Sequence, residues 1–533
     1  MDRFPPSRKR IIPSALGSSL TVLVAALALL WPAFVNGGPF WFPDTSNYVR
    51  AADGAAVFVT NSPSVWSDRL QVDRPPAGNP GAVDELANPA PDGSRISGEI
   101  KPTRPVLVGR SIYYGFLLYA PMRLFGPWGA VFLQALIVAG LLLFTASIIS
   151  REIGRMPPGL TAALVAALLI ASPLPFFTSM LIPDVYSGLL VLCFATVVAF
   201  WSRLRKVELI ALIAICAVIA TFHTTHILIV AAAGIVAAVF ALGGNRMRAI
   251  LIALPIVAAG ALSVAAFNLA VSFALGERPV SPPFLSARLT DAGPGTVFLQ
   301  ERCGDPGVDF VLCHYRDRLP VPSDAFLWDE KAATGVYQLF SDAERAQVSR
   351  EDVPFFLAVL AHDPIGLMGV SLQSFAQQLF HFDMSSFNYS RDHVQSIGVK
   401  YPAPVAATIR PTLAANMAMP LLPTVMLTIA TTLAALTMLA ALFVQAERRE
   451  GPRHLAWSWA ALVLLAVLAN AAICGALSGP HGRYQMRLIW LLPFVAGSLW
   501  VLRQRITRPV ATGADRHAAG LERAPGLAEE RSW

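Results

Sequence analysis

The sequence predicts an all-α membrane protein: a polytopic helical bundle of about ten transmembrane helices with two long outer loops that form a cap. Of its 533 residues, 55% are hydrophobic and only 14% are charged, and the mean hydropathy is +0.55. Long uncharged stretches recur along the chain, and a helix needs about 20 apolar residues to cross a bilayer. A membrane β-barrel would show short alternating segments instead, so the continuous apolar runs indicate helices.

Basic residues are distributed unevenly between the connections of the expected spans, which are 14–35, 127–150, 158–175, 184–202, 207–222, 225–242, 248–275, 418–444, 455–477 and 486–503. Connections such as 203–206 and 446–453 are rich in arginine, whereas 176–183 has no basic residue. Because basic loops stay in the cytoplasm, this asymmetry predicts that both termini are cytoplasmic and that the first span is an uncleaved anchor. The same rule accounts for the formal charge of +7, so nucleic acid is not expected as a partner.

The expected domain organisation has four parts. They are a transmembrane module (1–275) that includes a first outer loop (36–126), a second outer segment (276–416) that forms a periplasmic cap region with interfacial helices, further transmembrane helices (417–508) and a disordered cytoplasmic tail (509–533). Both long loops fall on one side of the membrane, so they are expected to pack together as a cap.

Two features of these outer segments have a specific structural expectation. Residues 105–125 are apolar but contain Arg110 and Arg123, so we expect a helix that lies in the outer membrane interface. Cys303 and Cys313 lie in the second outer segment, where an oxidising compartment would join them as a disulfide. A zinc site would need more ligands at regular spacing.

Asp44 is the leading catalytic candidate. It follows the first span directly and is preceded by Phe40, Trp41 and Phe42, while Tyr48 comes one helical turn later. A carboxylate sheltered by aromatic rings at the mouth of a bundle is suited to act as a general base, with Tyr48 contacting the substrate. The alternative is a solvated turn aspartate, since Pro-Asp-Thr-Ser is favourable turn sequence.

Asp184 lies after Pro183 at the outer mouth of a later span. Two acidic residues from different spans could converge on one cavity, where their oxygens would suit Mg²⁺ or Mn²⁺, so Asp184 is a metal-ligand candidate. The alternative is a helix N-cap, a position that aspartate favours and where its charge complements the helix dipole.

Histidines and arginines supply the candidate substrate-binding groups. His223 and His226 lie in a tight turn between spans, where they would bind a metal or phosphate, or else satisfy the turn by hydrogen bonds. Arg483 and Arg487 are one helical turn apart and could clamp a lipid phosphate, or else only extend to headgroups. The remaining candidates for the same anion site are Arg104, Arg110, His481 and Tyr484.

Over residues 14–240 this arrangement resembles the GT-C superfamily of membrane glycosyltransferases, especially its protein O-mannosyltransferase-like and aminoarabinose-transferase-like branches. The resemblance is carried by Asp44-x-x-x-Tyr48 after the first span, by Leu124-Phe125-Gly126 and by Pro183-Asp184. It implies a sugar donor linked to polyprenyl phosphate, an acceptor on the outer side, and Asp44 as the catalytic aspartate of the first loop. Where relatives often carry a Thr-Lys-Gly-like turn, this chain has Thr224-Thr225-His226, and 277–410 matches no known pattern.

The sequence therefore predicts an inverting glycosyltransferase of a bacterial inner membrane, with its active site facing the periplasm. Asp44 would deprotonate an acceptor hydroxyl of unknown identity, and the arginines would stabilise the departing polyprenyl phosphate among the membrane lipids, with or without a metal at Asp184. Three alternatives stay open: a transporter or flippase of lipid-linked glycans, a polymerase or ligase of surface polysaccharide, and an assembly protein without chemistry. A transporter would need charged or broken helices near the middle of the membrane.

Overall fold

The computed structural model describes residues 15–62, 64–67, 110–154, 156–276, 279–331, 334–444 and 452–507. Within these ranges the chain forms helices joined by turns and irregular segments, with isolated β-bridge residues such as Phe40 and Met180 but no strand, so the all-α prediction is confirmed. Arg104 and the predicted tail 509–533 lie outside the described residues.

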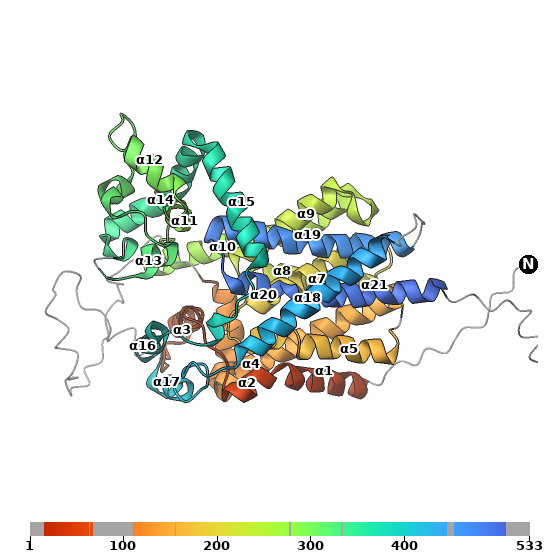
Figure 1. Cartoon of the computed structure of the whole chain (residues 1–533). Coiled ribbons are helices and arrows are strands. Elements are labelled where there is room, and N and C mark those ends of the chain that lie inside the picture. The colour runs from red at the N-terminus through yellow and green to blue at the C-terminus, as the bar shows by residue number, and fades with distance from the viewer. Residues whose placement is uncertain are drawn as a thin grey trace, which may run out of the picture.

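Long helices run side by side to form a bundle, and smaller helices gather at one end of it (Figure 1). The bundle helices are α1 (Ala15–Leu29), α4 (Ile112–Glu152), α5 (Pro158–Leu169), α7 (Asp184–Phe200), α8 (Lys206–Ala220), α9 (Thr224–Val239), α10 (Arg246–Leu275), α18 (Leu421–Val444), α19 (Pro452–Ser478) and α21 (Leu491–Thr507). The described start of α1 and end of α21 lie at the end of the bundle opposite the small helices (Figure 1).

Four helices in the described ranges are long and apolar enough to cross a membrane, namely α4, α10, α18 and α19. A fifth span results if the bent pair α14 (Asp342–His362) and α15 (Pro364–Phe380) is counted as one. The other apolar bundle helices are shorter, so the number of about ten spans stays a prediction.

The small helices belong to the two outer segments and to short connections. They are α2 (Trp31–Asn36), α3 (Thr45–Thr60), α6 (Leu174–Thr178), α11 (Phe284–Ala292), α12 (Pro294–Arg302), α13 (Ser323–Trp328), α16 (Arg391–Lys400), α17 (Ala403–Ile409) and α20 (Gly482–Ile489), with 3₁₀ helices at Leu242–Gly244, Val311–Arg318, Tyr337–Leu339 and Ser385–Phe387.

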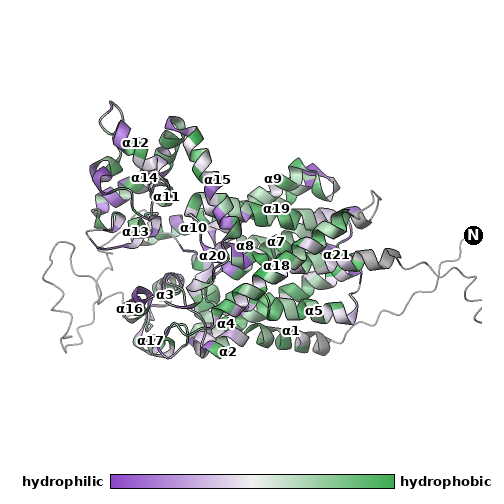
Figure 2. Ribbon diagram, in the orientation of Figure 1, coloured by the Kyte–Doolittle hydropathy of each residue, from purple (hydrophilic) through white to green (hydrophobic). Residues whose placement is uncertain are grey.

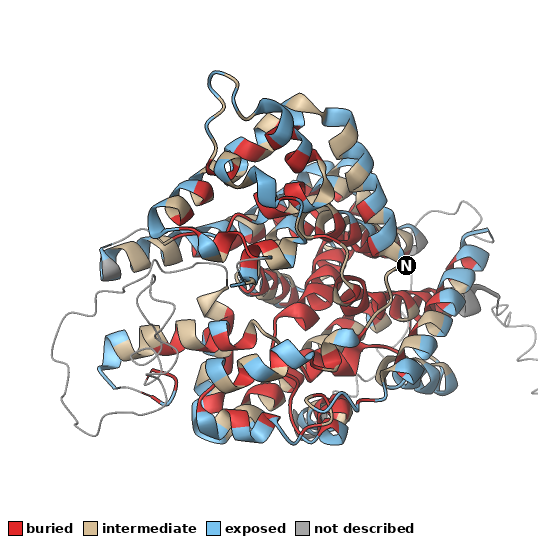
Figure 3. Ribbon diagram, turned by 60° about the vertical axis from the view of Figure 1, so that its left-hand side comes forward, coloured by how far each residue is buried: buried red, intermediate tan, exposed pale blue. Residues whose placement is uncertain are grey.

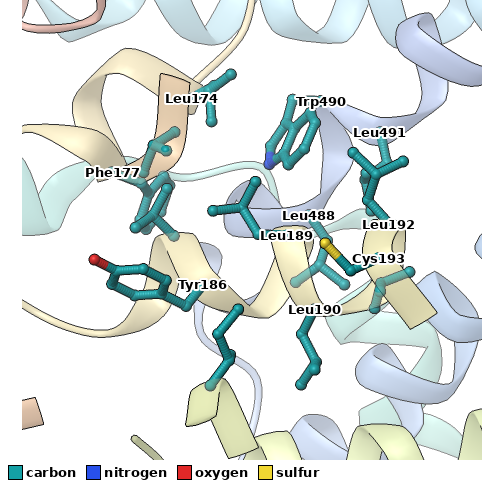
Figure 4. Packing of buried hydrophobic residues seen from close by; sticks show 14 of the residues in the cluster. Leu174, Phe177, Tyr186, Leu189, Leu190, Leu192, Cys193, Leu488, Trp490 and Leu491 are labelled. Atoms are coloured by element: carbon teal, nitrogen blue, oxygen red, sulfur yellow. The ribbon is translucent and has the colours of Figure 1, made fainter. Parts of the chain in front are cut away.

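Helix α7 lies at the centre of the bundle, because all of its residues from Asp184 to Phe200 are buried. A helix that is apolar on every side must be surrounded by protein or lipid. Figure 4 shows its leucines and Cys193 packed against Leu488, Trp490 and Leu491 from the C-terminal part of the chain. Figure 3 shows the buried ribbon concentrated in the middle of the bundle, and Figure 2 shows that the bundle helices are mostly apolar.

The described part of the predicted interfacial segment 105–125 leads into α4, which begins at Ile112, while residues 105–109 lie outside the described residues. Gly126 has φ 66° and ψ −167°, and with Pro121 and Pro127 it interrupts the helix. Residues 112–125 are therefore a helical segment distinct from the one that follows, as expected, whereas its orientation to a membrane stays a prediction.

The second outer segment contains a hydrophobic core of its own, which we call the cap core. It is built from α11–α14 and their connections, around residues such as Phe298, Leu312, Tyr337 and Phe355. A disulfide joins Cys303 to Cys313 beside it, the pair expected from the sequence. Further along, Tyr389 and Tyr401 contact residues 41 and 42, so the two outer segments do pack together.

Candidate functional site

A single backbone contact brings the two candidate carboxylates into one region. Phe40 and Met180 form a parallel β-bridge, in which the Phe40 N–H donates to the Ser179 carbonyl (2.9 Å) and the Leu181 N–H donates to the Phe40 carbonyl (3.0 Å). Asp44 comes four residues after Phe40 and Asp184 four residues after Met180, so both lie where a helix begins. The Arg483 guanidinium interacts electrostatically with both carboxylates, which places them around one cation.

Asp44 occupies the N-cap position of α3, but its side chain makes no capping hydrogen bond. Its Oδ2 instead lies 2.7 Å from Nη2 of Arg110, and the side chains of Asp44 and Arg110 are 20% and 18% exposed. The carboxylate is thus held by a cation and stays partly exposed. The turn-aspartate alternative accounts for its backbone position but not for this ion pair.

Tyr48 lies one turn into α3 and is buried. Its ring packs edge to face on Tyr114 of α4, with ring centroids 5.1 Å apart. This close approach depends on Gly115, because a Cβ there would lie 2.3 Å from the Tyr48 carbonyl oxygen. Burial raises the pKa of the Tyr48 hydroxyl, so it is neutral at physiological pH.

Asp184 is buried and bound by two arginines from α20. Its Oδ1 lies 2.6 Å from Nη1 of Arg487, and its Oδ2 lies 3.9 Å from Nη1 of Arg483. Nη2 of Arg487 also donates to Oδ1 of Asn470 (2.9 Å), so this guanidinium ties α7 to α19 and α20. Pro183 occupies the N-cap position of α7 and Asp184 is the first helical residue, where its charge is placed well for the helix dipole.

Arg483 and Arg487 differ in how exposed they are and in how fully their hydrogen-bond donors are occupied. Arg487 is 1% exposed and its donors face Asp184, Asn470 and Cys474. Arg483 is 20% exposed and is stacked between rings, with its central carbon 4.3 Å from the Phe42 centroid and 4.9 Å from the Tyr484 centroid. The two rings hold the Arg483 guanidinium in place, and its Nη2 donates to the Tyr484 hydroxyl (3.2 Å), so a partly exposed cation suited to an anion is fixed here.

The histidines take separate places. His226 is buried, and its Nδ1 donates to the Ile219 carbonyl (2.8 Å), so its Nε2 accepts the hydroxyl hydrogen of Ser187 (2.9 Å). Both ring nitrogens of His226 are thereby used inside the protein, in agreement with the hydrogen-bonded-turn alternative. His223 accepts a hydrogen bond from the Thr225 N–H (3.1 Å) and caps α9, yet it lies within the electrostatic influence of Arg110 and Arg483.

His481 is held by its backbone. Gln378 of α15 donates to the His481 carbonyl (3.0 Å) and accepts from the His481 N–H (2.8 Å). Burial and the nearby Arg483 guanidinium lower the pKa of the His481 imidazole, so it is neutral at pH 7. Its ring lies 5.3 Å from that of Tyr484, which places it at the border of the site.

In the described part of the chain, two guanidinium groups rather than further oxygen ligands lie beside the Asp184 carboxylate. In the described part of the chain, no group of three or more His, Cys, Asp or Glu side chains is placed to hold one. Mg²⁺ and Mn²⁺ favour several oxygen ligands, whereas the neighbours of this carboxylate are two guanidinium groups that would repel a dication. The metal hypothesis stays a prediction, and no chemical step below depends on it.

Several residues that build the site were not identified from the sequence. Gln134 of α4 donates to the carbonyls of Thr178 (2.9 Å) and Met180 (2.7 Å) and so fixes the segment that leads to Asp184. A polar amide inside an apolar helix is a recognisable signal, and the same holds for Asn470. Tyr389 and Tyr401 gave no such signal.

Comparison of the chain with protein-family models, with characterised proteins and with solved structures found no significant match.

Proposed function

We propose that the protein is a membrane glycosyltransferase of the GT-C type, which moves a sugar from a polyprenyl-phosphate-linked donor to an acceptor on the outer side of a bacterial inner membrane, with inversion. The observation that carries the proposal is the meeting of Asp44 and Asp184 with Arg110, Arg483 and Arg487 at the end of the bundle where the outer segments lie. A lipid-linked substrate can reach such a place from the bilayer, and a polar acceptor can reach it from water.

The reaction joins an acceptor hydroxyl oxygen to the anomeric carbon and breaks the bond from that carbon to the phosphate oxygen. Asp44 takes the proton of the hydroxyl, with Arg110 holding its carboxylate in place at 2.7 Å. The departing polyprenyl phosphate gains one negative charge. Arg483, stacked on Phe42 and partly exposed, is the cation placed to stabilise that charge.

Asp184 and Arg487 serve a different purpose in this scheme. Their buried contact at 2.6 Å fixes α20 against α7 and so orients Arg483, which lies one turn before Arg487. Oδ2 of Asp184 is buried and accepts no hydrogen bond from the described residues, while Nη1 of Arg483 lies 3.9 Å from it.

The test is transfer of labelled sugar from a polyprenyl-phosphate donor in proteoliposomes. We expect Asp44→Asn to lower the rate by about 100-fold or more, the usual contribution of a general base. Asp317→Asn, at a 98% exposed side chain, is the matched control and should keep the wild-type rate. Full activity of Asp44→Asn would remove the assignment of the base.

The same assay separates the alternatives. A transporter or flippase would move the labelled lipid across the bilayer without transferring its sugar, and its site would lie near mid-membrane rather than at one end of the bundle. A polymerase or ligase would use the same carrier, but its activity would not depend on Asp44.

A further inference from the structure

Helices α14 and α15 form a bent pair whose outer faces are apolar. The helix axis bends by 108° between α14 and α15, around Asp363. On their inner faces, α14 contributes Phe355 and Val359 to the cap core, and α15 buries Ser374 and Gln378. Their opposite faces contact no other part of the described chain closely enough to be buried.

These opposite faces carry a row of large apolar side chains, which we call the apolar edge. It consists of residues that are between 39% and 77% exposed: Val353, Leu357, Leu360, Ile365, Met368 and Leu372. Their spacing of three or four residues puts them on one face of each helix. An exposed apolar surface that continues across two helices marks a site of contact with a partner or a membrane.

Charged side chains are frequent in the first half of α14 and become rare where the apolar edge begins. The first half of the helix contains Glu344, Arg345, Arg350 and Glu351, whereas no lysine or arginine occurs from Val353 to Phe380. The one carboxylate in that stretch, Asp363, accepts the Gly366 N–H (2.8 Å) and caps α15. Such a change is what a chain segment shows when it passes from water into lipid.

The position of α15 indicates that lipid, rather than a protein partner, covers the apolar edge. It packs on α19, a helix of membrane-spanning length, so closely that a Cβ at Gly475 would lie 2.7 Å from the Ser374 carbonyl oxygen. Figure 1 shows α15 beside α19 at the end of the bundle where the outer segments gather, with the bend projecting away from the bundle. The apolar edge thus belongs to a helix pair that packs on a bundle whose helices are mostly apolar (Figure 2).

We propose that the apolar edge of α14 and α15 is inserted in the outer leaflet of the bilayer, so that this helix pair is a membrane-seated hairpin rather than part of a water-exposed cap. Amphipathic helices that lie in the membrane interface likewise have one apolar face buried among the lipid acyl chains and one polar face. This inference does not depend on glycosyl transfer.

The hairpin is also connected to the arginine site. Gln378, at the end of α15, exchanges two hydrogen bonds with the backbone of His481, two residues before Arg483. The depth at which α15 is seated in lipid therefore fixes the height of Arg483 relative to the headgroups.

The experiment uses the full chain in vesicles of phosphatidylethanolamine and phosphatidylglycerol. Nitroxide labels are attached to Leu357→Cys, Ile365→Cys and Met368→Cys, with Gln347→Cys on an exposed polar position of α14 as the matched control. We expect the three edge labels to collide with oxygen and to be protected from a water-soluble nickel complex, and the control label to show the reverse. Nickel accessibility at Ile365 and Met368 equal to that at Gln347 would overturn the proposal, as would dipolar broadening that reveals a second copy on the edge.

Photolabelling of the unmodified protein by lipid tests the same proposal without cysteine variants. A lipid that carries a carbene-forming group in its acyl chain is photolysed in the same vesicles, and the adducts are mapped by mass spectrometry of peptides. Adducts within 353–372 are expected at a level similar to those on α10. Adducts on α10 without any on 353–372 contradict the proposal.

Discussion

Phe40 and Met180 form a parallel bridge that gives Asp44 and Asp184 equivalent positions, each four residues further along its chain segment and each at the start of a helix. Thr45 reinforces this arrangement from the next position. Its Oγ1 accepts the Phe42 N–H (3.0 Å) and donates to the Leu181 carbonyl (3.0 Å), so one hydroxyl joins the segment before α3 to the segment before α7.

The first prediction concerns this hydroxyl. Thr45→Val keeps the shape of a buried side chain and leaves the Phe42 N–H and the Leu181 carbonyl without their partner. We expect a loss of about 1–3 kcal/mol in stability, because both groups become unsatisfied, together with a lower transfer rate. Thermal unfolding in detergent and the proteoliposome assay measure the two effects. Thr60→Val is the matched control, since the hydrogen bonds of the Thr60 hydroxyl, to the Ala56 carbonyl and from the Ser62 N–H, are local and exposed. Equal losses in the two variants would contradict the role of Thr45.

The second prediction separates the two arginines of α20. Arg487→Met leaves the buried Asp184 carboxylate without its 2.6 Å partner, so we expect a stability loss of about 3–5 kcal/mol. Arg483→Gln removes a partly exposed cation whose nearest carboxylate oxygen is 3.9 Å away, so its stability cost should stay within about 1 kcal/mol. Its transfer rate should nevertheless fall on the order of 100-fold, as for a lost oxyanion donor.

Adding Asp184→Asn to Arg487→Met provides the internal control for that experiment, because it removes the uncompensated charge and should restore part of the lost stability. Similar unfolding midpoints for Arg483→Gln and Arg487→Met would show that the two arginines do not have the distinct roles assigned to them.

Sequence patterns identified the helices better than they identified the contacts between them. The continuous apolar run at 184–202 predicted α7 to within two residues at its end, because hydrophobicity along the chain reports burial directly. The disulfide and the break at Gly126 were likewise accessible from local residue types. Whether Arg483 or Arg487 stays available to a ligand was not, because that depends on Asp184, about 300 residues earlier in the chain.

The same limit applies to the histidines and tyrosines. The sequence left His226 as a ligand or a turn residue, and only its neighbour Ser187 on another helix decides that both nitrogens are used. Tyr389 and Tyr401 hold residues 41 and 42 from about 350 positions away, and nothing in their local sequence marks them. Gln134 is the exception, since an amide within a long apolar run is conspicuous in the sequence itself.

The third prediction tests the contact between α3 and α4. A Cβ at Gly115 would lie 2.3 Å from the Tyr48 carbonyl oxygen and 3.2 Å from the Ala52 side chain, so Gly115→Ala forces the two helices apart. We expect a stability loss of about 1–3 kcal/mol from overpacking. We also expect a reduced transfer rate, because Asp44 lies at the start of α3 and would move with that helix.

Gly140→Ala is the matched control on α4, where an added Cβ meets nothing within 4 Å. The control should be neutral or stabilising by up to about 1 kcal/mol, since alanine favours helix, and a similar loss at both positions would contradict the steric argument.

The fourth prediction is a pH dependence that originates at His393 of α16. Burial, assisted by the charge of Lys400, lowers the pKa of this imidazole from 6.5 to about 4. Below pH 6.5 the unfolded chain therefore binds a proton that the folded protein does not, so stability falls as the pH is lowered from about 6.5 to about 4 and is unaffected above that window. The slope from this group is at most about 1.4 kcal/mol per pH unit.

The variant His393→Phe tests this origin. It retains an aromatic ring against Tyr389, whose ring centroid is 4.5 Å away, and it should flatten this part of the stability curve, as measured by unfolding midpoints between pH 4 and 8. A His393→Phe protein with the wild-type slope would show that the acid sensitivity arises at other groups.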